Sequence, residues 1–252
     1  MNTTVRKAGT EEEGLVSEKM DIEILELITG ARKASGLAVI IDVFRAFSLE
    51  CYLCEFGARE IRPVETVEES FSWRERDRDC ILVGERKGKM CEGFDFGNSP
   101  STVDPEAVKG RRVIHTTSAG TQGIINAVNA QEIITGSLVN AAATAEYIRE
   151  RRPSVVSLVC MGTGGTVPNR EDRLCAEYIK SLILGEELPD LDEQVKSLRY
   201  DGGEHFFDPD NQDVFPKEDF GMCTDCNRFD FVLRAERDGL GLKALKIPVR
   251  SR

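Results

Sequence analysis

The sequence lacks any apolar run near the length of about 18 residues needed to cross a membrane, and its N-terminus lacks the apolar core of a signal peptide. Basic residues are in the minority: 33 Lys and Arg stand against 44 Asp and Glu, which gives a net charge of −11. Such a surface repels the phosphates of nucleic acids and of anionic membranes. We therefore expect a cytoplasmic protein that binds neither nucleic acid nor membrane.

Histidine is scarce, whereas the eight cysteines are even in number. Free thiols are expected rather than disulfides, because a signal peptide is absent and 252 residues can bury a sizeable core. Cys223 and Cys226 form a CxxC, which supplies half of a tetrahedral zinc site. The other half is missing nearby, where His205 and aspartates are the candidates, so we favour a CxxC without zinc.

No internal repeat is present, and apolar strand-like runs alternate with helix-like segments from residue 21 to residue 184. The predicted strands are 21–25, 37–43, 59–64, 80–84, 112–116, 131–136 and 154–160. The predicted helices are 45–57, 66–76, 119–130, 140–151 and 170–184. This alternation predicts a three-layer α/β fold, in which a mainly parallel or mixed sheet has helices on both faces.

The two ends of the chain differ from this pattern. Residues 1–19 are polar and acidic without periodicity, and we expect a flexible N-terminal extension there. Residues 20–252 are expected to form a single α/β domain. Its last part, residues 190–227, is rich in Asp, Gly and Pro, and closing strands are predicted near 229–233 and 244–249.

Four predicted strands end in polar residues that suit an anionic ligand. The polar segments are 42–48, 84–100, 116–121 and 160–173. The carboxyl ends of parallel strands lie along one edge of a sheet, and ligands bind at that edge. We therefore expect Asp42, Glu85, Thr116 and Asp172 to converge there, although more than 120 residues separate the first from the last.

Six motifs follow one another in these segments. They read DVFRAFS at 42–48, GER at 84–86, GFDFGNSP at 93–100, TTSAGT at 116–121, CMGTGG at 160–165 and EDRLCA at 171–176. Over about residues 21–185 the chain resembles 2-phosphosulfolactate phosphatase, the ComB family of coenzyme M biosynthesis. The resemblance implies an α/β enzyme, a phosphoric monoester hydrolase that uses magnesium and acts on a small anionic 2-phospho acid.

Hydrolysis of a phosphate monoester requires positive charge around the phosphoryl oxygens and a nucleophile. Magnesium prefers oxygen ligands and keeps several waters, so one to three carboxylates suffice to bind it. Asp42, Glu85 and Asp172 are the predicted Mg²⁺ ligands, and Asp95 is a further candidate. Asp172 could instead be an acidic residue that stabilises the N-terminus of a helix, although Glu171 fits that role better.

Anion recognition in so acidic a protein requires local donors. Arg45 and Arg86 are predicted to clamp phosphate or sulfonate oxygens, while the alternative for Arg45 is an internal ion pair with Asp42. The predicted substrate-binding residues are Ser48, Asn98, Thr116, Thr117, Gly120, Thr121 and Gly162. Simple helix capping by Ser118 explains the threonine segment equally well.

The sequence leaves three candidates for the nucleophile: the carboxylate of Asp42, the thiolate of Cys160 and a magnesium-bound water. A glycine-rich turn after Cys160 can lower a thiol pKa, but a cysteine that ends a buried strand is typical of a core. His115 has the chemistry of a general acid, yet a packed strand histidine is the favoured interpretation.

Two other functions fit the same sequence. One is a different enzyme acting on phosphorylated hydroxy acids with the same scaffold, and the other is a non-catalytic protein that binds anions or metals. The chain departs from the family motifs at Phe44 and Phe47 and at 118–119, which leaves the substrate open. The oligomeric state is also open, and a homodimer is one option.

Overall fold

The computed structural model describes residues 20–249. Its strands are β1 (Asp21–Glu26), β2 (Leu37–Ile41), β3 (Glu60–Pro63), β4 (Ile81–Arg86), β5 (Lys89–Met90), β6 (Arg112–Thr116), β7 (Glu132–Gly136), β8 (Val155–Cys160), β9 (Phe231–Asp238) and β10 (Gly241–Pro248). Its α-helices are α1 (Leu27–Lys33), α2 (Ala46–Glu55), α3 (Val67–Arg76), α4 (Pro105–Val108), α5 (Gly120–Asn126), α6 (Ala141–Arg151), α7 (Arg170–Leu184), α8 (Leu191–Ser197) and α9 (Lys217–Thr224). Short 3₁₀ helices are η1 (Pro100–Thr102), η2 (Leu138–Asn140), η3 (Leu198–Tyr200), η4 (Glu204–Phe207) and η5 (Pro209–Asn211).

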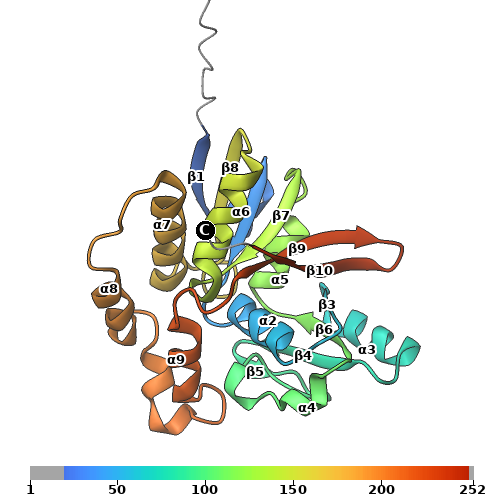
Figure 1. Ribbon diagram of the computed structural model, residues 1–252. Helices are drawn as coiled ribbons and strands as arrows, with labels where there is room; N and C mark the ends of the chain where they lie inside the picture. Colours follow the sequence, from blue (N-terminus) through green and yellow to red (C-terminus); the bar gives the residue numbers. More distant parts are fainter. Residues whose placement is uncertain (1–19, 250–252) are drawn as a thin grey trace, which may run out of the picture.

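The described strands form one mixed sheet in the order β1-β8-β2-β7-β9-β10-β3-β6-β4-β5. Strands β1, β8, β2 and β7 pair in parallel, and so do β3, β6 and β4. The C-terminal hairpin β9–β10 lies antiparallel between these two groups (Figure 1). The predicted closing strands therefore join the middle of the sheet rather than cover an edge.

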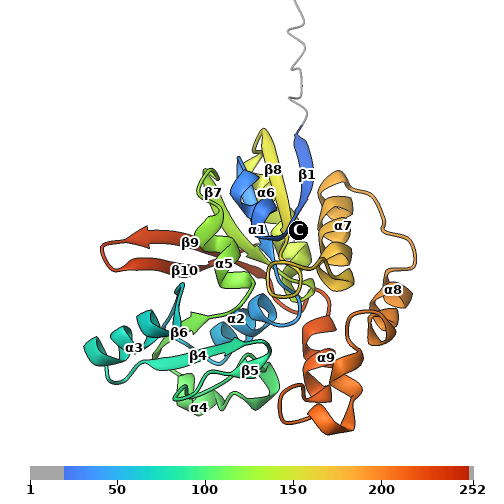
Figure 2. The same cartoon turned by 180° about the vertical axis from the view of Figure 1, so that it is seen from behind.

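Helices cover both faces of the sheet, as Figures 1 and 2 show from opposite sides. Successive residues of β2 point to opposite faces: Val39 packs in one core with α6 and α7, whereas Ile40 packs in another with α1 and α5. Each fully buried aliphatic side chain contributes about 1.5–3 kcal/mol. Burial on both sides explains why β2 is apolar throughout. The predicted three-layer α/β fold is confirmed.

The predicted elements up to residue 184 occur close to their predicted positions, and α7 coincides with its predicted range. Helix α5 is shorter than the predicted helix 119–130, because it ends at Asn126 and not at residue 130. Helices α1, α4, α8 and α9 were not predicted. The expected flexible extension at residues 1–19 lies outside the described residues. Among residues 20–249 we find no helix with the length and apolar character to cross a membrane.

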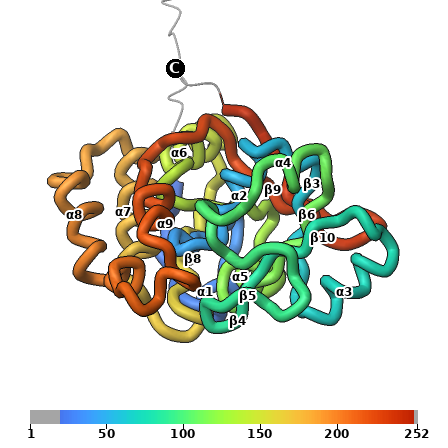
Figure 3. Tube along the Cα trace, turned by 90° about the horizontal axis from the view of Figure 1, so that it is seen from below, coloured from blue at the N-terminus to red at the C-terminus, as the bar shows by residue number. Residues whose placement is uncertain are grey.

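The carboxyl ends of β1, β8 and β2 point toward residues 198–224, which include η3, η4, η5 and α9 (Figure 1). Figure 3 views the molecule from that side. Helix α9 contacts η1, η2 and η4, so this late segment is packed against the loops after β5 and β7. The edge predicted to bind a ligand is thereby partly covered.

Candidate active site

A cavity of about 530 Å³ opens where the loops after β2, β4 and β8 meet the segment around residues 202–215. Five of the predicted site residues line it: Asp42, Arg45, Glu85, Asn98 and Gly162. The structure therefore brings together side chains that the sequence placed at three different strand ends. We take this cavity as the candidate site.

Asp42 follows β2 and is buried. Its Oδ1 accepts a hydrogen bond of 3.1 Å from the amide of Ala46 in the first turn of α2. Gly120 lies so close that a Cβ there would be 2.9 Å from Oδ2 of Asp42. Burial raises the pKa of Asp42, and the charges of Asp172 and Glu85 raise it further. Its ionised form therefore needs a nearby cation.

Asp172 lies in the first turn of α7 and bridges two loops from behind the cavity. Its Oδ1 accepts from the amide of Val43 at 2.8 Å, and its Oδ2 accepts from the amide of Gly162 at 2.8 Å. Burial raises the pKa of Asp172 to about 6, although these amide hydrogen bonds act in the opposite direction. Asp172 thus fixes the ends of β2 and β8 relative to each other.

Glu171, the neighbour of Asp172, lines the cavity, which the sequence did not predict. Its Oε1 accepts from Asn169 at 2.7 Å, whereas its buried Oε2 has no hydrogen-bond partner within residues 20–249. Burial raises the pKa of Glu171 to about 9, and the charges of Asp172 and Asp42 add to this effect. In the sequence, the adjacent acids Glu171 and Asp172 are the feature that could have indicated Glu171 as a site residue.

Glu85 ends the β4 strand with both carboxylate oxygens engaged. Oε1 accepts from the amide of Ser118 at 2.6 Å, and Oε2 accepts from the amide of Gly88 at 2.7 Å. These contacts hold the β4–β5 turn beside the start of α5. Glu85 therefore shapes the cavity wall as well as adding negative charge to it.

The fit of a metal ion can be judged from these carboxylates. Within the part of the chain that the structure describes, no group of three or more His, Cys, Asp or Glu is arranged to hold a metal. The predicted set of Asp42, Glu85 and Asp172 is thus not a preformed three-ligand cluster, because Glu85 and Asp172 use both oxygens on amides.

Asp42 and Glu171 remain as carboxylates that face the cavity. Neither forms a salt bridge within residues 20–249. The orphaned Oε2 of Glu171 and the raised pKa values of both groups suit a divalent cation. Mg²⁺ is usually held by one or two carboxylates, water and substrate phosphate, so these residues fit it.

Arg45 lies at the cavity wall, but its Nη1 is engaged by the protein itself. Nη1 donates to Oδ2 of Asp219 at 2.7 Å and to the carbonyl of Val214 at 2.9 Å, and the guanidinium stacks on Phe215. The internal ion pair considered for Arg45 is therefore made with Asp219 and not with Asp42. A sequence pattern of short range cannot show a partner 174 residues away.

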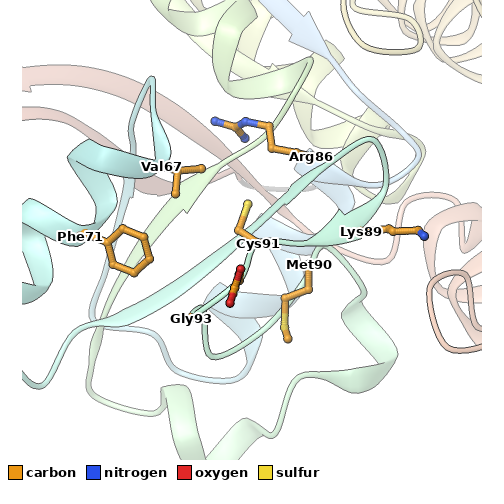
Figure 4. Close-up of a pocket in the computed structure, with 8 residues that line it drawn as sticks. Val67, Phe71, Arg86, Lys89, Met90, Cys91 and Gly93 are labelled. Atoms are coloured by element: carbon orange, nitrogen blue, oxygen red, sulfur yellow. The ribbon is translucent and has the colours of Figure 1, made fainter.

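Arg86 is not brought into the cavity. It donates to Oγ1 of Thr116 at 3.0 Å and lines a separate groove of about 660 Å³. Figure 4 shows it there with Phe71 and Cys91. Consecutive strand residues point to opposite sides, so Glu85 reaches the cavity and Arg86 does not.

Several of the predicted substrate-binding residues instead bond within the protein. Thr117 and Thr121 cap each other, because each backbone amide donates to the other's Oγ1, at 2.9 and 3.1 Å. Oγ1 of Thr116 donates to the carbonyl of Glu65, and Oγ of Ser48 donates to that of Val43. The helix cap expected from Ser118 is not formed, because Ala119 is the N-cap of α5 and Oγ of Ser118 donates to Oε2 of Glu85. Asn98 and Gly162 do line the cavity.

Cys160 is buried at the end of β8, where its thiol donates to the carbonyl of Asp172 at 3.4 Å. Burial raises the pKa of this thiol, and the charge of Asp172 raises it further, so the thiolate is disfavoured. Asp95 lies elsewhere, paired with Arg74. All eight cysteines are free, including Cys223 and Cys226.

His115 is fully buried on β6, which agrees with the interpretation that it is a histidine packed in the interior on a strand. Its Nδ1 lies 2.8 Å from Oε1 of Glu50, and its Nε2 lies 3.2 Å from Oδ1 of Asn98. The ring does not line the cavity. Asn98 does line the cavity, and the contact with His115 helps to hold the Asn98 side chain in place.

Comparison with known proteins adds independent information. A family model described as 2-phosphosulpholactate phosphatase matches residues 22–203. A protein of Bacillus subtilis (strain 168) named probable 2-phosphosulfolactate phosphatase is 32% identical over 208 residues, which cover 81% of this chain and 89% of the relative. A protein of the same name from Clostridium perfringens (strain 13 / Type A) is 32% identical over 229 residues, covering 85% and 92%. One from Caldicellulosiruptor saccharolyticus is 39% identical over 158 residues, covering 61% and 64%.

The α/β fold, the cavity lined by carboxylates at the carboxyl edge of its sheet and these matches identify the chain as an enzyme of the phosphoric monoester hydrolase class. It belongs to the 2-phosphosulfolactate phosphatase family. The resemblance inferred from the six motifs is thereby confirmed. The family match contains Asp42 and Glu171 but ends before His205 and Phe215, which also line the cavity.

Proposed function

We propose that the chain is a magnesium-dependent phosphatase that converts 2-phosphosulfolactate, or a closely related small 2-phospho acid, to the hydroxy acid and phosphate. The observation that carries the proposal is the pair of buried carboxylates, Asp42 and Glu171, which face one cavity without a cationic partner in the described chain. The names of the relatives support the same reaction.

Asp42 and Glu171 are the residues that would hold Mg²⁺. When bound, the ion supplies positive charge that neutralises the phosphoryl oxygens. The remaining steps belong to the protein: Asp172 keeps the loops at Val43 and Gly162 in register, and Glu85 holds the amide of Ser118 at the cavity wall. This preorganisation positions the phosphoryl group for attack.

The nucleophile is proposed to be Asp42 or a water, and not Cys160. The thiol of Cys160 is buried behind the cavity and its pKa is raised, whereas Asp42 faces the cavity directly. Trapping of a phosphorylated Asp42 with a slow substrate would separate the two remaining choices.

The test is phosphate release from a panel of phosphorylated hydroxy acids with and without Mg²⁺. Glu171→Gln should lower kcat/KM by about 10- to 100-fold, the range for removing a group that supports a metal. The matched control is Glu187→Gln, which changes an exposed glutamate beyond the C-terminus of α7. Absence of magnesium-stimulated release from every phosphorylated acid would overturn the proposal in favour of a binding protein. If phosphate is released only from phosphorylated hydroxy acids that do not resemble 2-phosphosulfolactate, the alternative of a different enzyme on the same scaffold is favoured.

Finer expectations from the sequence stay predictions. They are a role in coenzyme M biosynthesis, a cytoplasmic location and the absence of nucleic-acid binding, while the oligomeric state stays open with a homodimer as one option.

A further inference from the structure

The cavity that Asp42 and Glu171 face is also lined by two basic side chains and one imidazole: Arg45, Lys87 and His205. Nη1 of Arg45 is engaged by Asp219 and by the carbonyl of Val214, and Nη2 lies 3.4 Å from the carbonyl of Gly88. Arg45 is thus committed to the protein's own structure. Lys87 and His205 remain as the groups with donors for a ligand.

His205 stands in the 3₁₀ helix η4 and reaches the cavity between two aromatic rings. The centroid of its ring lies 4.2 Å from that of Phe206 and 4.4 Å from that of Phe215. No hydrogen bond to either ring nitrogen is present within residues 20–249. The aromatic contacts therefore fix the ring while leaving its nitrogens available.

Lys87 stands in the turn between β4 and β5, a separate part of the chain. Its backbone has a φ of 55°, and the turn is held by the bond from the amide of Gly88 to Oε2 of Glu85. Its side chain is exposed and has no ion-pair or hydrogen-bond partner among the described residues. A fixed turn thus presents a cation without a protein partner to the cavity.

Besides its phosphoryl group, a 2-phospho acid carries a second anionic group close by on a short skeleton, and 2-phosphosulfolactate carries both a carboxylate and a sulfonate. The phosphoryl group is expected beside Asp42 and Glu171, where a cation would bind. The second group, a carboxylate or sulfonate, needs donors of its own, because bringing it next to unpaired carboxylates would cost free energy. Lys87 and His205 are suited to that need.

We propose that Lys87 and His205 form the subsite that recognises the acid group of the substrate and so determine specificity for 2-phospho acids over simple phosphate esters. The proposal rests on the proposed function.

The test uses two substrates that differ only in the acid group: 2-phospholactate and isopropyl phosphate, in which a methyl group replaces the carboxylate. Lys87→Met removes the cation, and His205→Phe removes the ring nitrogens while retaining the contacts with Phe206 and Phe215. Each variant should raise KM for 2-phospholactate about tenfold to hundredfold, the loss expected for one charge-assisted hydrogen bond. The kcat/KM for isopropyl phosphate should not change.

Lys89→Met is the matched control, because Lys89 is exposed in the same β4–β5 region but lines the other groove. Equal losses on both substrates, or no loss on either, would overturn the subsite. Binding of 2-phospholactate measured by calorimetry with Mg²⁺ gives a readout independent of turnover, and Lys87→Met and His205→Phe should weaken it while Lys89→Met does not. If the wild-type protein binds 2-phospholactate in this way but releases phosphate from neither substrate, the proposed function fails and the subsite stands.

Discussion

Nη1 of Arg45 and Oδ2 of Asp219 lie 2.7 Å apart, and both side chains are buried. Asp219 also accepts from Oγ of Ser99 and from the amide of Ser101, each at 3.0 Å. This one carboxylate therefore joins α9, the loop after β2 and the end of the GFDFGNSP motif. The segment before α9, which carries His205 to the cavity, is held in place by the same network.

Replacement of Asp219 by Asn should destabilise the protein by about 3–5 kcal/mol, because it leaves the buried guanidinium of Arg45 without its counter-charge. Urea denaturation measures the loss. The control is Asp225→Asn, which breaks the half-exposed pair with Arg228 and should cost less than about 1 kcal/mol. Equal effects in the two variants would contradict a structural role for the buried pair.

The stability of the metal-free protein should fall as pH rises. Glu171 has a pKa raised from 4.5 to about 9, so the stability it contributes is complete below pH 4.5 and is lost as pH rises toward 9. The carboxylates of Asp42, Asp172 and Asp201 face it and contribute to this shift. Each such group changes the free energy of unfolding by at most about 1.4 kcal/mol per pH unit.

Urea denaturation in the presence of a chelator, from pH 5 to pH 9, measures this dependence. Glu171→Gln should show a shallower decline than the wild type, and Glu187→Gln should follow the wild type. Added Mg²⁺ should also flatten the decline, since a bound cation favours the ionised carboxylates. Parallel curves for the wild type and Glu171→Gln would mean that Glu171 is ionised throughout.

The sequence sufficed for most of the fold because its local patterns are strong. The apolar run of β2 and the amphipathic α7 are specified by residues close to one another. The placement of β9 and β10 was not accessible in this way. These strands pair with β7 and β3, which lie about 100 and 180 residues earlier, and no local pattern encodes that choice.

The site was predictable only to the level of which strand ends take part. Adjacent helix residues point about 100° apart, so the sequence could not show that Glu171 faces the cavity while Asp172 faces two backbone amides. The same limitation applies to Glu85 and Arg86 on a strand. His205 lines the cavity through packing against Phe206 and Phe215, and no motif in the sequence indicated that position.

Cys160→Ser should leave kcat and KM close to their wild-type values. The thiol lies behind the cavity, and burial raises its pKa, so little nucleophilic thiolate exists at neutral pH. Steady-state kinetics on the best phosphorylated substrate measure the effect. A loss of several orders of magnitude in a correctly folded variant would restore Cys160 as the nucleophile.

Gly120→Ala should reduce catalysis by displacing Asp42. A Cβ at this position would lie 2.8 Å from Cβ of Ala46 and 2.9 Å from Oδ2 of Asp42, so one of these groups must move. A shift of about 1 Å in a reacting group can cost about a hundredfold in rate, and overpacking costs about 1–3 kcal/mol of stability. We expect kcat to fall at least about tenfold while circular dichroism shows a folded protein.

Gly221→Ala is the control for Gly120→Ala. Gly221 lies in α9, where an added Cβ meets nothing within 4 Å, so alanine should be neutral or raise stability by up to about 1 kcal/mol. Thermal denaturation and initial-rate kinetics on both variants separate packing from catalysis. If Gly120→Ala folds and keeps wild-type kcat, Asp42 does not act on the substrate, because its carboxylate is the cavity-facing group that the new methyl would contact.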